Sequence, residues 1–332
     1  MTAPPLLSLV IPAKDEAPRL ATTFGSLTRQ FPDPADLQVV FVDDGSTDDT
    51  SEVVETWSAR FPRFDVVRHD TPHGLADSRN DGLALAQADH IAFLDGDDWL
   101  RPGHLAAVHR ALTDLDVDFV RCDHTTVTGG ARSYKRAPMS VRGLPLRPRA
   151  GILPAHDSTM IDYPYAWAGG FHRRLLDDGL LRFPAGFQTA EDRSWIWDLH
   201  LHARSFAVID APGICYRRGT ATSLTQVYDR RQLDFTRAFQ RIFDLVVADA
   251  ESQALWPKAA RNWLAILQHH VGRLPRMEAD VRHEFSALTT EVSHRIPADV
   301  LRAELRAASK KRFDAVLPYL PDRFAHLQEA SR

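Results

Sequence analysis

Short apolar runs alternate with amphipathic segments along the first 122 residues of this 332-residue chain. The apolar runs predict buried strands at Leu6–Pro12, Leu37–Val42, Phe64–Val67, His90–Leu94 and Val117–Cys122. The segments between them carry apolar residues at helical spacing, over Arg19–Gln30, Thr47–Arg60, Leu75–Ala88 and Pro102–Leu115. This alternation indicates βαβ units, and therefore an α/β fold whose parallel sheet is covered by helices on both faces.

Acidic residues directly follow three of the predicted strands. They are Asp15-Glu16, Asp43-Asp44 and the group Asp95, Asp97 and Asp98. Because right-handed crossovers place the carboxyl ends of parallel strands along one edge, we expect all three groups to meet there. Open α/β sheets bind their ligands in the crevice at this edge.

The acidic turn at residues 95–98 is the sharpest of these signals. Three carboxylates within four positions repel one another unless a proton or a cation lies among them. Oxygen ligands suit Mg²⁺ or Mn²⁺ better than zinc, and such an ion can also bridge a diphosphate. The alternative is a solvated acidic turn before the helix that begins at Pro102.

Other polar residues near the predicted strand ends have two readings each. Asp43 can accept hydrogen bonds from a base or a ribose, and Arg79 can hold a phosphate or lie at the surface. Glu191-Asp192 opens a predicted helix, where acidic residues stabilise the helix dipole, but a carboxylate there can also serve as a general base for a hydroxyl. Arg217-Arg218 follows a strand and is either a phosphate contact or a surface turn.

The second half of the chain changes character. Residues 125–154 are rich in Arg and Pro and predict a long loop, which is either a solvated surface loop or a mobile lid or acceptor-binding loop. The segment Ser205–Tyr216 predicts two short strands. Beyond residue 228 the pattern predicts four amphipathic helices, Arg230–Ala250, Leu255–Leu274, Glu278–Arg295 and Ala298–Ala308. We therefore expect a domain at 1–228 and a helical domain at 229–332, whose helices are candidates for oligomerisation, acceptor binding or contact with a membrane surface.

Composition narrows the function classes. A net charge of −4 argues against wholesale nucleic-acid binding. The two cysteines, Cys122 and Cys215, exclude a disulfide scaffold and a thiolate zinc cluster and fit a reducing compartment. The longest nearly apolar stretch is far shorter than the roughly 18 residues of a membrane-spanning helix, and no secretory signal is visible. These features predict a cytoplasmic protein, with the inner face of the membrane as a second possibility.

Taken together, these motifs resemble the family 2 inverting glycosyltransferases of the GT-A fold. The matching segments are SLVIPAKDE at 8–16, VVFVDDGSTDDT at 39–50, GLADSRNDGLALAQADHIAFLDGDDWL at 74–100 and FPAGFQTAED at 183–192. The resemblance implies a GT-A, Rossmann-like, mostly parallel sheet flanked by helices. The helical C-terminal appendage lies outside the matching segments.

The resemblance also implies roles for individual residues. On the donor side, the nucleotide would be contacted by Pro12, Asp15, Glu16, Asp43, Asp44 and Arg79. Asp97 would be the direct ligand of Mg²⁺ or Mn²⁺, with Asp95 nearer the ribose and Arg217 or Arg218 on the diphosphate. Asp192 would be the catalytic base, and Glu191 would position the acceptor or the sugar.

The implied reaction is metal-dependent transfer of a hexose or N-acetylhexosamine from a nucleotide diphosphate sugar to a hydroxyl. UDP is the nucleotide that the family uses most, and the acceptor would be a glycan, a lipid-linked glycan or a cell-wall or surface glycopolymer. Two rivals remain. A haloacid-dehalogenase-like phosphatase would need Thr or Val two residues after the second Asp, where this chain has Trp99. A catalytically inactive glycan-binding module would lack the carboxylates at Asp97 and Asp192.

Overall fold

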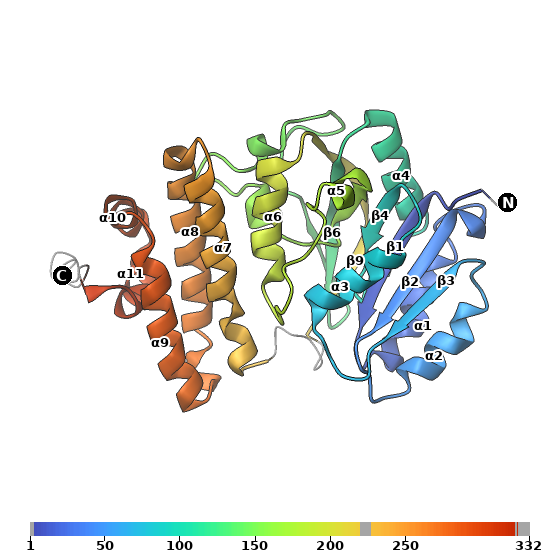
Figure 1. Ribbon diagram of the computed structural model, residues 1–332, viewed down its shortest axis with the longest axis horizontal. Helices are drawn as coiled ribbons and strands as arrows, with labels where there is room; N and C mark the ends of the chain where they lie inside the picture. Colours follow the sequence, from blue (N-terminus) through green and yellow to red (C-terminus); the bar gives the residue numbers. More distant parts are fainter. Residues whose placement is uncertain (1–2, 220–226, 323, 325–332) are drawn as a thin grey trace.

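The structure is a computed structural model that describes residues 3–219, 227–322 and 324. A sheet with helices on both faces forms one end of an elongated molecule, and helices from the last third of the chain stack at the other end (Figure 1). Helix α6 (Glu191–His202) lies between the two parts. The α/β class and the C-terminal helices that the sequence predicts are confirmed.

The sheet contains nine strands in the order β3-β2-β1-β4-β8-β6-β9-β5, with β7 paired to β6. Their bounds are Leu7–Ala13 (β1), Leu37–Asp43 (β2), Phe64–Arg68 (β3), His90–Phe93 (β4), Trp99–Leu100 (β5), Phe119–Thr128 (β6), Ala131–Lys135 (β7), Gly169–His172 (β8) and Phe206–Arg218 (β9). Every residue of β1 and β2 is buried, as expected for central strands with helices on both faces.

Parallel pairing is confined to part of this sheet. Strands β3, β2, β1 and β4 pair in parallel, as the sequence predicts, whereas β8 runs antiparallel to both β4 and β6. Strand β8 reaches its place because it begins with glycine: a Cβ atom on Gly169 would lie 1.9 Å from the carbonyl oxygen of Val120. The four residues of β8 are too few to give a strand signal in the sequence. Strands β6 and β9 pair in parallel again, so the longest pairings of the sheet are parallel, as predicted, and antiparallel pairs occur at β8, β5 and β7.

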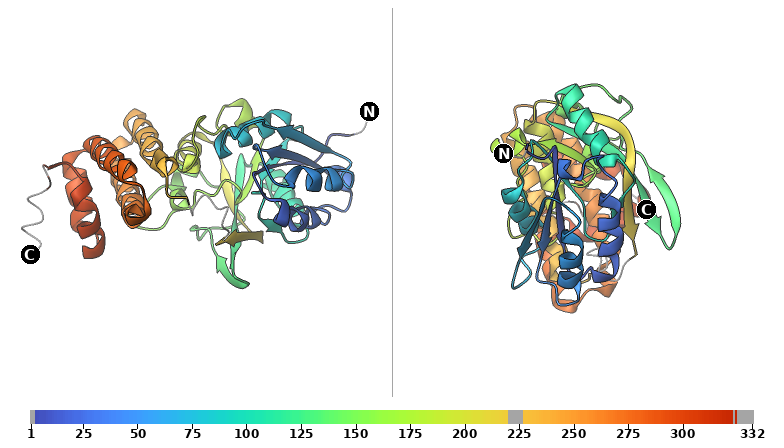
Figure 2. Two further views of the ribbon diagram at one scale, coloured as in Figure 1. Left: turned by 90° about the horizontal axis from the view of Figure 1, so that it is seen from below. Right: turned by 90° about the vertical axis from the view of Figure 1, so that its right-hand side faces the viewer.

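The predicted helices of the first domain are present within a few residues of their expected ends. They are α1 (Ala17–Leu27), α2 (Thr50–Ser58), α3 (Leu75–Leu85) and α4 (His104–Leu115), followed by the short α5 (Arg174–Asp177). Helix α3 covers one face of β1 and β2, and α1 and α2 lie on the opposite face (Figure 2). Leu20, Phe24 and Leu27 form the buried side of α1, in agreement with their spacing.

Two stretches differ from the expectation. The segment at 125–154 is not a plain loop, because β6 continues to Thr128 and forms a hairpin with β7. Two arginines of this segment form ion pairs within the fold: Arg142 pairs with Asp123, and Arg149 pairs with Asp249, between helices α7 and α8 of the C-terminal part. The two short strands expected in Ser205–Tyr216 are one long strand, β9, whose pairing with β6 shifts register between Cys122 and His124.

Helices α7 (Asp234–Ala248), α8 (Ser252–Val271), α9 (Ala279–His294), α10 (Ala298–Ala307) and α11 (Lys310–Val316) form the far end of the molecule. The expected four are present and α11 is additional; Pro257, expected to separate helices, lies inside α8. One hydrophobic core runs from the sheet through α6 into these helices. The boundary at residue 228 therefore remains a prediction. Within the described residues, no helix is long and apolar enough to cross a membrane.

Candidate active site

The three acidic strand ends meet at one edge of the sheet. The backbone N–H of Asp44 donates to the carbonyl of Ala13 at 2.9 Å, and that of Gly96 donates to the carbonyl of Pro12 at 3.2 Å. The end of β1 is thus held between the segments that follow β2 and β4. This arrangement confirms the expectation drawn from parallel topology.

Asp43 lies at the end of β2 with its carboxylate in a fixed position. It accepts hydrogen bonds from the backbone N–H of Ser46 at 2.9 Å and from the hydroxyl of Ser51 at 3.0 Å. The turn that follows requires glycine, because Gly45 has φ of +69° and a Cβ there would lie 2.9 Å from the backbone of Pro72. A buried carboxylate held in this way is a rigid acceptor, which suits the predicted contact with a base.

Asp44 holds the turn that leads into α3. Its carboxylate accepts from the backbone N–H groups of His73 at 2.7 Å and Gly74 at 2.9 Å, and lies 2.8 Å from Nδ1 of His69. Burial alone would raise the pKa of Asp44, but these hydrogen bonds lower it below its ordinary value. The carboxylate of Asp44, which was predicted to contact the donor nucleotide, is therefore already used to hold this turn in place.

Residues 15 and 16 are joined to the loop after β2. Asp15 has a left-handed backbone with φ of +55°, and its carboxylate accepts from the backbone N–H of Thr47 at 2.7 Å. The backbone N–H of Glu16 donates to the hydroxyl of Thr50 at 3.0 Å, and its carboxylate pairs with Arg19. These hydrogen bonds join residues 15 and 16 to residues 46–50, so that the segments after β1 and β2 form one continuous wall.

The DGDD turn after β4 crowds several carboxylates together. Burial first, and then the nearby charges of Asp95 and Glu16, raise the pKa of Asp97 to about 7. Asp98 is fully buried and accepts from the backbone N–H of Arg217 at 2.6 Å, while its other oxygen has no hydrogen-bond partner within the described part of the chain. An oxygen-only donor set under such mutual repulsion has the chemistry that suits a hard divalent cation, and Asp97 is the predicted direct ligand.

Arg79 connects this turn to α6. Its Nη1 donates to Glu191 at 2.6 Å and its Nη2 donates to Asp95 at 3.1 Å, while only 3% of its side chain is exposed. Burial opposes the charge of Arg79, but Asp95, Glu191 and Asp192 together raise its pKa. The sequence predicts Arg79 as a phosphate contact; the structure shows its guanidinium paired with two carboxylates.

Asp192 lies in the first turn of α6, next to this pair. The residue before the helix, Ala190, has a left-handed backbone with φ of +61°, which an alanine adopts only at a cost. Burial first, and then the charge of Glu191, raise the pKa of Asp192 to about 7, against the lowering effects of Arg193 and Arg79. A carboxylate with this proton affinity is suited to general-base catalysis near neutral pH.

Arg217 and Arg218 have different surroundings. Arg217 donates through Nε to the backbone carbonyl of Asp97 at 2.9 Å, and its guanidinium lies 4.7 Å from the ring centre of Trp99. It therefore fastens β9 to the DGDD turn. Arg218, the last residue of β9, is exposed and lies opposite Thr128.

An aromatic wall beside Asp192 was not predicted from the sequence. The rings of Tyr165 and Trp167 stack with centres 4.7 Å apart, and Tyr216 of β9 lies 4.9 Å from Trp167. Burial first, and then the charge of Asp192, raise the pKa of Tyr165, so this wall lies near the predicted base. The aromatic run at 163–167 is the signal that could have indicated it.

A comparison with known families decides the assignment. The sequence model described as "Glycosyl transferase family 2" matches residues 8–199, which is more than half of the chain. The chain belongs to glycosyl transferase family 2. All the acidic motifs described above, including Asp192, fall inside the matched residues.

Individual relatives are distant in sequence. The chain is 25% identical over 232 residues to the uncharacterized glycosyltransferase EpsJ of Bacillus subtilis, covering 69% of this chain and 66% of that protein. It is 23% identical over 207 residues to the poly(ribitol-phosphate) beta-glucosyltransferase of Bacillus spizizenii, covering 61% of this chain and 30% of that protein.

Structural similarity to known proteins extends beyond residues 8–199, which the family model matches. The crystal structure of S. aureus TarS 1–349 in complex with UDP-GlcNAc superposes with a TM-score of 0.74 at 18% identity, covering 97% of this chain and 92% of that one. The similarity includes the C-terminal helices, which the family model does not reach. The GT-A fold implied by the sequence motifs is thereby confirmed.

Proposed function

We propose that this chain transfers a sugar from a UDP-sugar to a hydroxyl group of a cell-wall or surface glycopolymer, with inversion at the anomeric carbon and with Mg²⁺ or Mn²⁺ bound at the DGDD turn. The observation that carries the proposal is the bridge made by Arg79, which joins Asp95 of that turn to Glu191 beside Asp192. The buried guanidinium of Arg79 thus links the predicted donor site to the helix turn that carries the predicted base.

On the donor side, the rigid carboxylate of Asp43 would orient the base, and the wall made by residues 15, 16 and 46–50 would enclose the nucleoside. Asp97 would hold the divalent ion, with Asp95 nearer the ribose. When bound, such an ion neutralises the charge that develops on the leaving diphosphate. The UDP specificity is proposed from the fold similarity to a UDP-GlcNAc complex.

On the acceptor side, Asp192 would take the proton of the attacking hydroxyl as the new glycosidic bond forms and the bond to the diphosphate breaks. Inversion follows because this is one displacement without a covalent intermediate. Glu191 does not act as a second nucleophile in this scheme, because its carboxylate is paired with Arg79 at 2.6 Å. The aromatic wall at Tyr165 and Trp167 would pack against a sugar ring next to Asp192.

The acceptor class follows from the names of the similar proteins, which include a poly(ribitol-phosphate) glucosyltransferase. Oligomerisation through the C-terminal helices, contact with a membrane surface and a cytoplasmic location remain predictions from the sequence.

A nucleotide-release assay tests the proposal. UDP-, GDP- and dTDP-sugars are supplied with Mn²⁺, with and without candidate glycopolymer acceptors. We expect Asp192→Asn to keep UDP-sugar binding and to reduce transfer by about 10²–10⁴-fold. Asp198→Asn, in the same helix and paired only with His202 in the described structure, is the matched control and should keep full activity. Full activity of Asp192→Asn would remove this residue from the role of base.

A further inference from the structure

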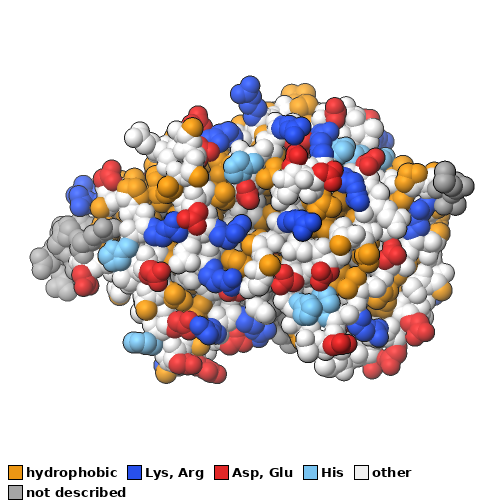
Figure 3. Space-filling model, in the orientation of Figure 1, with side chains coloured by type: hydrophobic (Ala, Val, Ile, Leu, Met, Phe, Trp, Pro, Cys, Tyr) orange, Lys and Arg blue, Asp and Glu red, His pale blue; other side chains and the backbone are white. Residues whose placement is uncertain are grey.

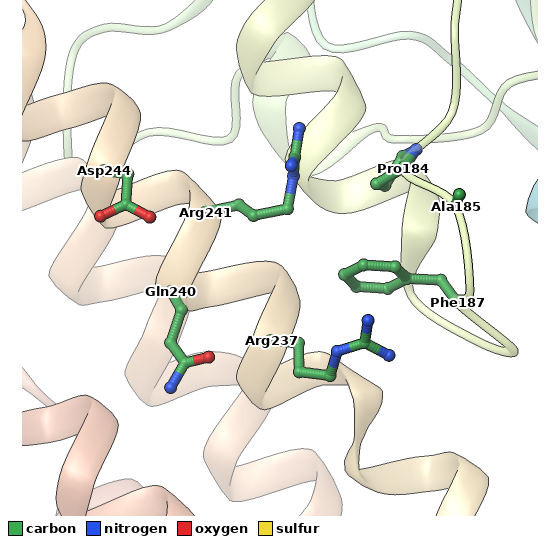
Figure 4. Close-up of a pocket in the computed structure, with 7 residues that line it drawn as sticks. All are labelled: Pro184, Ala185, Phe187, Arg237, Gln240, Arg241 and Asp244. Atoms are coloured by element: carbon green, nitrogen blue, oxygen red, sulfur yellow. The ribbon is translucent and has the colours of Figure 1, made fainter.

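A pocket of about 290 Å³ lies between the 183–187 loop and helix α7, outside the catalytic residues described above (Figure 4). We call it the arginine pocket. Its lining residues are Pro184, Ala185, Phe187, Arg237, Gln240, Arg241 and Asp244. Lys and Arg side chains also gather over the seam between α7 and α6 on the face shown in Figure 3.

Two arginines extend from α7 toward the loop in this pocket. The guanidinium of Arg237 lies 4.4 Å from the ring centre of Phe187 and donates to the carbonyl of Gly186 at 2.9 Å. Arg241, one turn further along α7, is exposed and makes no hydrogen bond or ion pair within the described residues. A guanidinium held near an aromatic ring, next to a second one without a partner, is a common setting for bidentate recognition of a phosphate.

The carboxylates nearby do not neutralise Arg241. Asp244 forms an ion pair with Arg295. Asp234 pairs with Arg237 and also accepts from the backbone N–H of Gln188 at 2.7 Å. Asp234 therefore neutralises Arg237, and Asp244 is engaged by Arg295, so the excess positive charge of the arginine pocket lies on Arg241.

The pocket shares its loop with the catalytic base. On one side, Asn80 of α3 exchanges two hydrogen bonds with the backbone of Phe183, each 2.9 Å long, and Asp77 accepts from the backbone N–H of Gly186 at 3.1 Å. On the other side, Asp234 of α7 holds the residue that follows the loop. The chain then reaches Glu191 and Asp192 directly, so the pocket lies on the α7 side of the predicted acceptor-binding region.

Positive charge also acts on helix α8 of the C-terminal part. Burial first, and then the charges of Arg273, Arg193 and Arg218, lower the pKa of His269 in α8. Arg193 of α6, Arg218 of β9 and Arg273, which follows α8, therefore all act on His269. Repeated guanidinium groups on two sides of α6 are complementary to a chain that carries repeated negative charges.

We propose that the arginine pocket binds a phosphate group of the acceptor, and that the acceptor is a phosphodiester-linked polyol or sugar polymer. This inference rests on the proposed transferase function and specifies its acceptor. A phosphodiester chain fits because its anionic groups recur at regular intervals, so that one unit occupies the arginine pocket while the hydroxyl of another unit meets Asp192. A neutral glycan leaves Arg241 without a partner.

Binding is measured with fluorescently labelled poly(ribitol phosphate) by anisotropy at low and at physiological salt. Poly-glutamate serves as a carboxylate polyanion and dextran as a neutral polymer. We expect the full chain to bind poly(ribitol phosphate) most tightly and with strong salt dependence, and Arg241→Gln to weaken this binding roughly tenfold. Arg241→Lys, which keeps the charge and loses the planar fork, should fall between the two.

Arg110→Gln is the matched control, because Arg110 is exposed on α4, far from α7. This variant should bind the polymer like the unmodified chain, and every variant should keep its affinity for UDP with Mn²⁺. Equal binding by Arg241→Gln, equal affinity for poly-glutamate, or equal affinity for dextran would each overturn the proposal. A change of oligomeric state in Arg241→Gln would overturn it too, because the pocket would then be an interface between copies. Absence of UDP binding in the unmodified chain would instead refute the proposed function.

Discussion

Removal of the guanidinium that bridges the two halves of the site is the most direct test of the structure. In Arg79→Gln, the carboxylate of Glu191 loses its 2.6 Å partner while only 5% of its side chain is exposed. Asp95, which loses a 3.1 Å contact, is 25% exposed and can be hydrated more easily. Breaking one side of a buried ion pair costs about 3–5 kcal/mol of unfolding free energy, and the burial of Glu191 places this variant in that range.

The measurement is urea denaturation of the metal-free protein near neutral pH, followed by far-UV circular dichroism. A second variant, Arg79→Gln with Glu191→Gln, removes the uncompensated charge and should regain more than half of the lost stability. The cycle completed by Glu191→Gln alone should give a coupling energy on the order of 2 kcal/mol. A loss below about 1 kcal/mol in Arg79→Gln, the value of an exposed pair, would show that the bridge is not buried in solution and would refute this reasoning.

Two further predictions concern protons and metal. A carboxylate at Asp192 can serve as a base only when it is ionised. Because burial and then the charge of Glu191 raise the pKa of Asp192 to about 7, kcat should fall as the pH drops below about 7. Glu191→Gln removes one cause of the raised pKa and should move the acid limb of the pH–rate profile to lower pH; an unmoved limb would contradict the assignment of Asp192. Burial, and then the charges of Asp95 and Glu16, raise the pKa of Asp97 to about 7, so Mn²⁺ binding near neutral pH should release protons and weaken as the pH falls. Calorimetry in buffers of different ionisation enthalpy measures this proton release, and Asp97→Asn should abolish it. A binding heat that does not depend on the buffer would count against Asp97 as a ligand.

Local sequence patterns predicted the parts of the site that depend on strand order alone. The segments after β1, β2 and β4 meet because parallel crossovers leave no other arrangement, and this was visible in the positions of Asp15, Asp43 and Asp95. The same logic failed for β8, whose antiparallel entry depends on the close approach of Gly169 to Val120. Such an approach is a tertiary contact without a periodic signal.

Side-chain partners were harder to predict than positions. The sequence placed Arg79 near the acidic turn, but not its pairing with Glu191, 112 residues further along the chain. Spacing alone did not distinguish Asp98 from the other carboxylates of its turn, but in the structure Asp98 is fully buried and accepts a hydrogen bond from the backbone of Arg217. Rotamer choice and burial decide these outcomes, and neither is encoded in spacing.

The loop that contains Phe183 has a consequence for how the molecule is divided. One of its ends is tied to α3 through Asn80, and the stretch that follows is tied to α7 through Asp234. The helices beyond residue 228 are therefore joined to the loop that leads into α6, and they supply one of the two anchors of the segment that precedes Asp192. Exchange of those helices between relatives should therefore alter the position of the predicted base as well as the surface beside it.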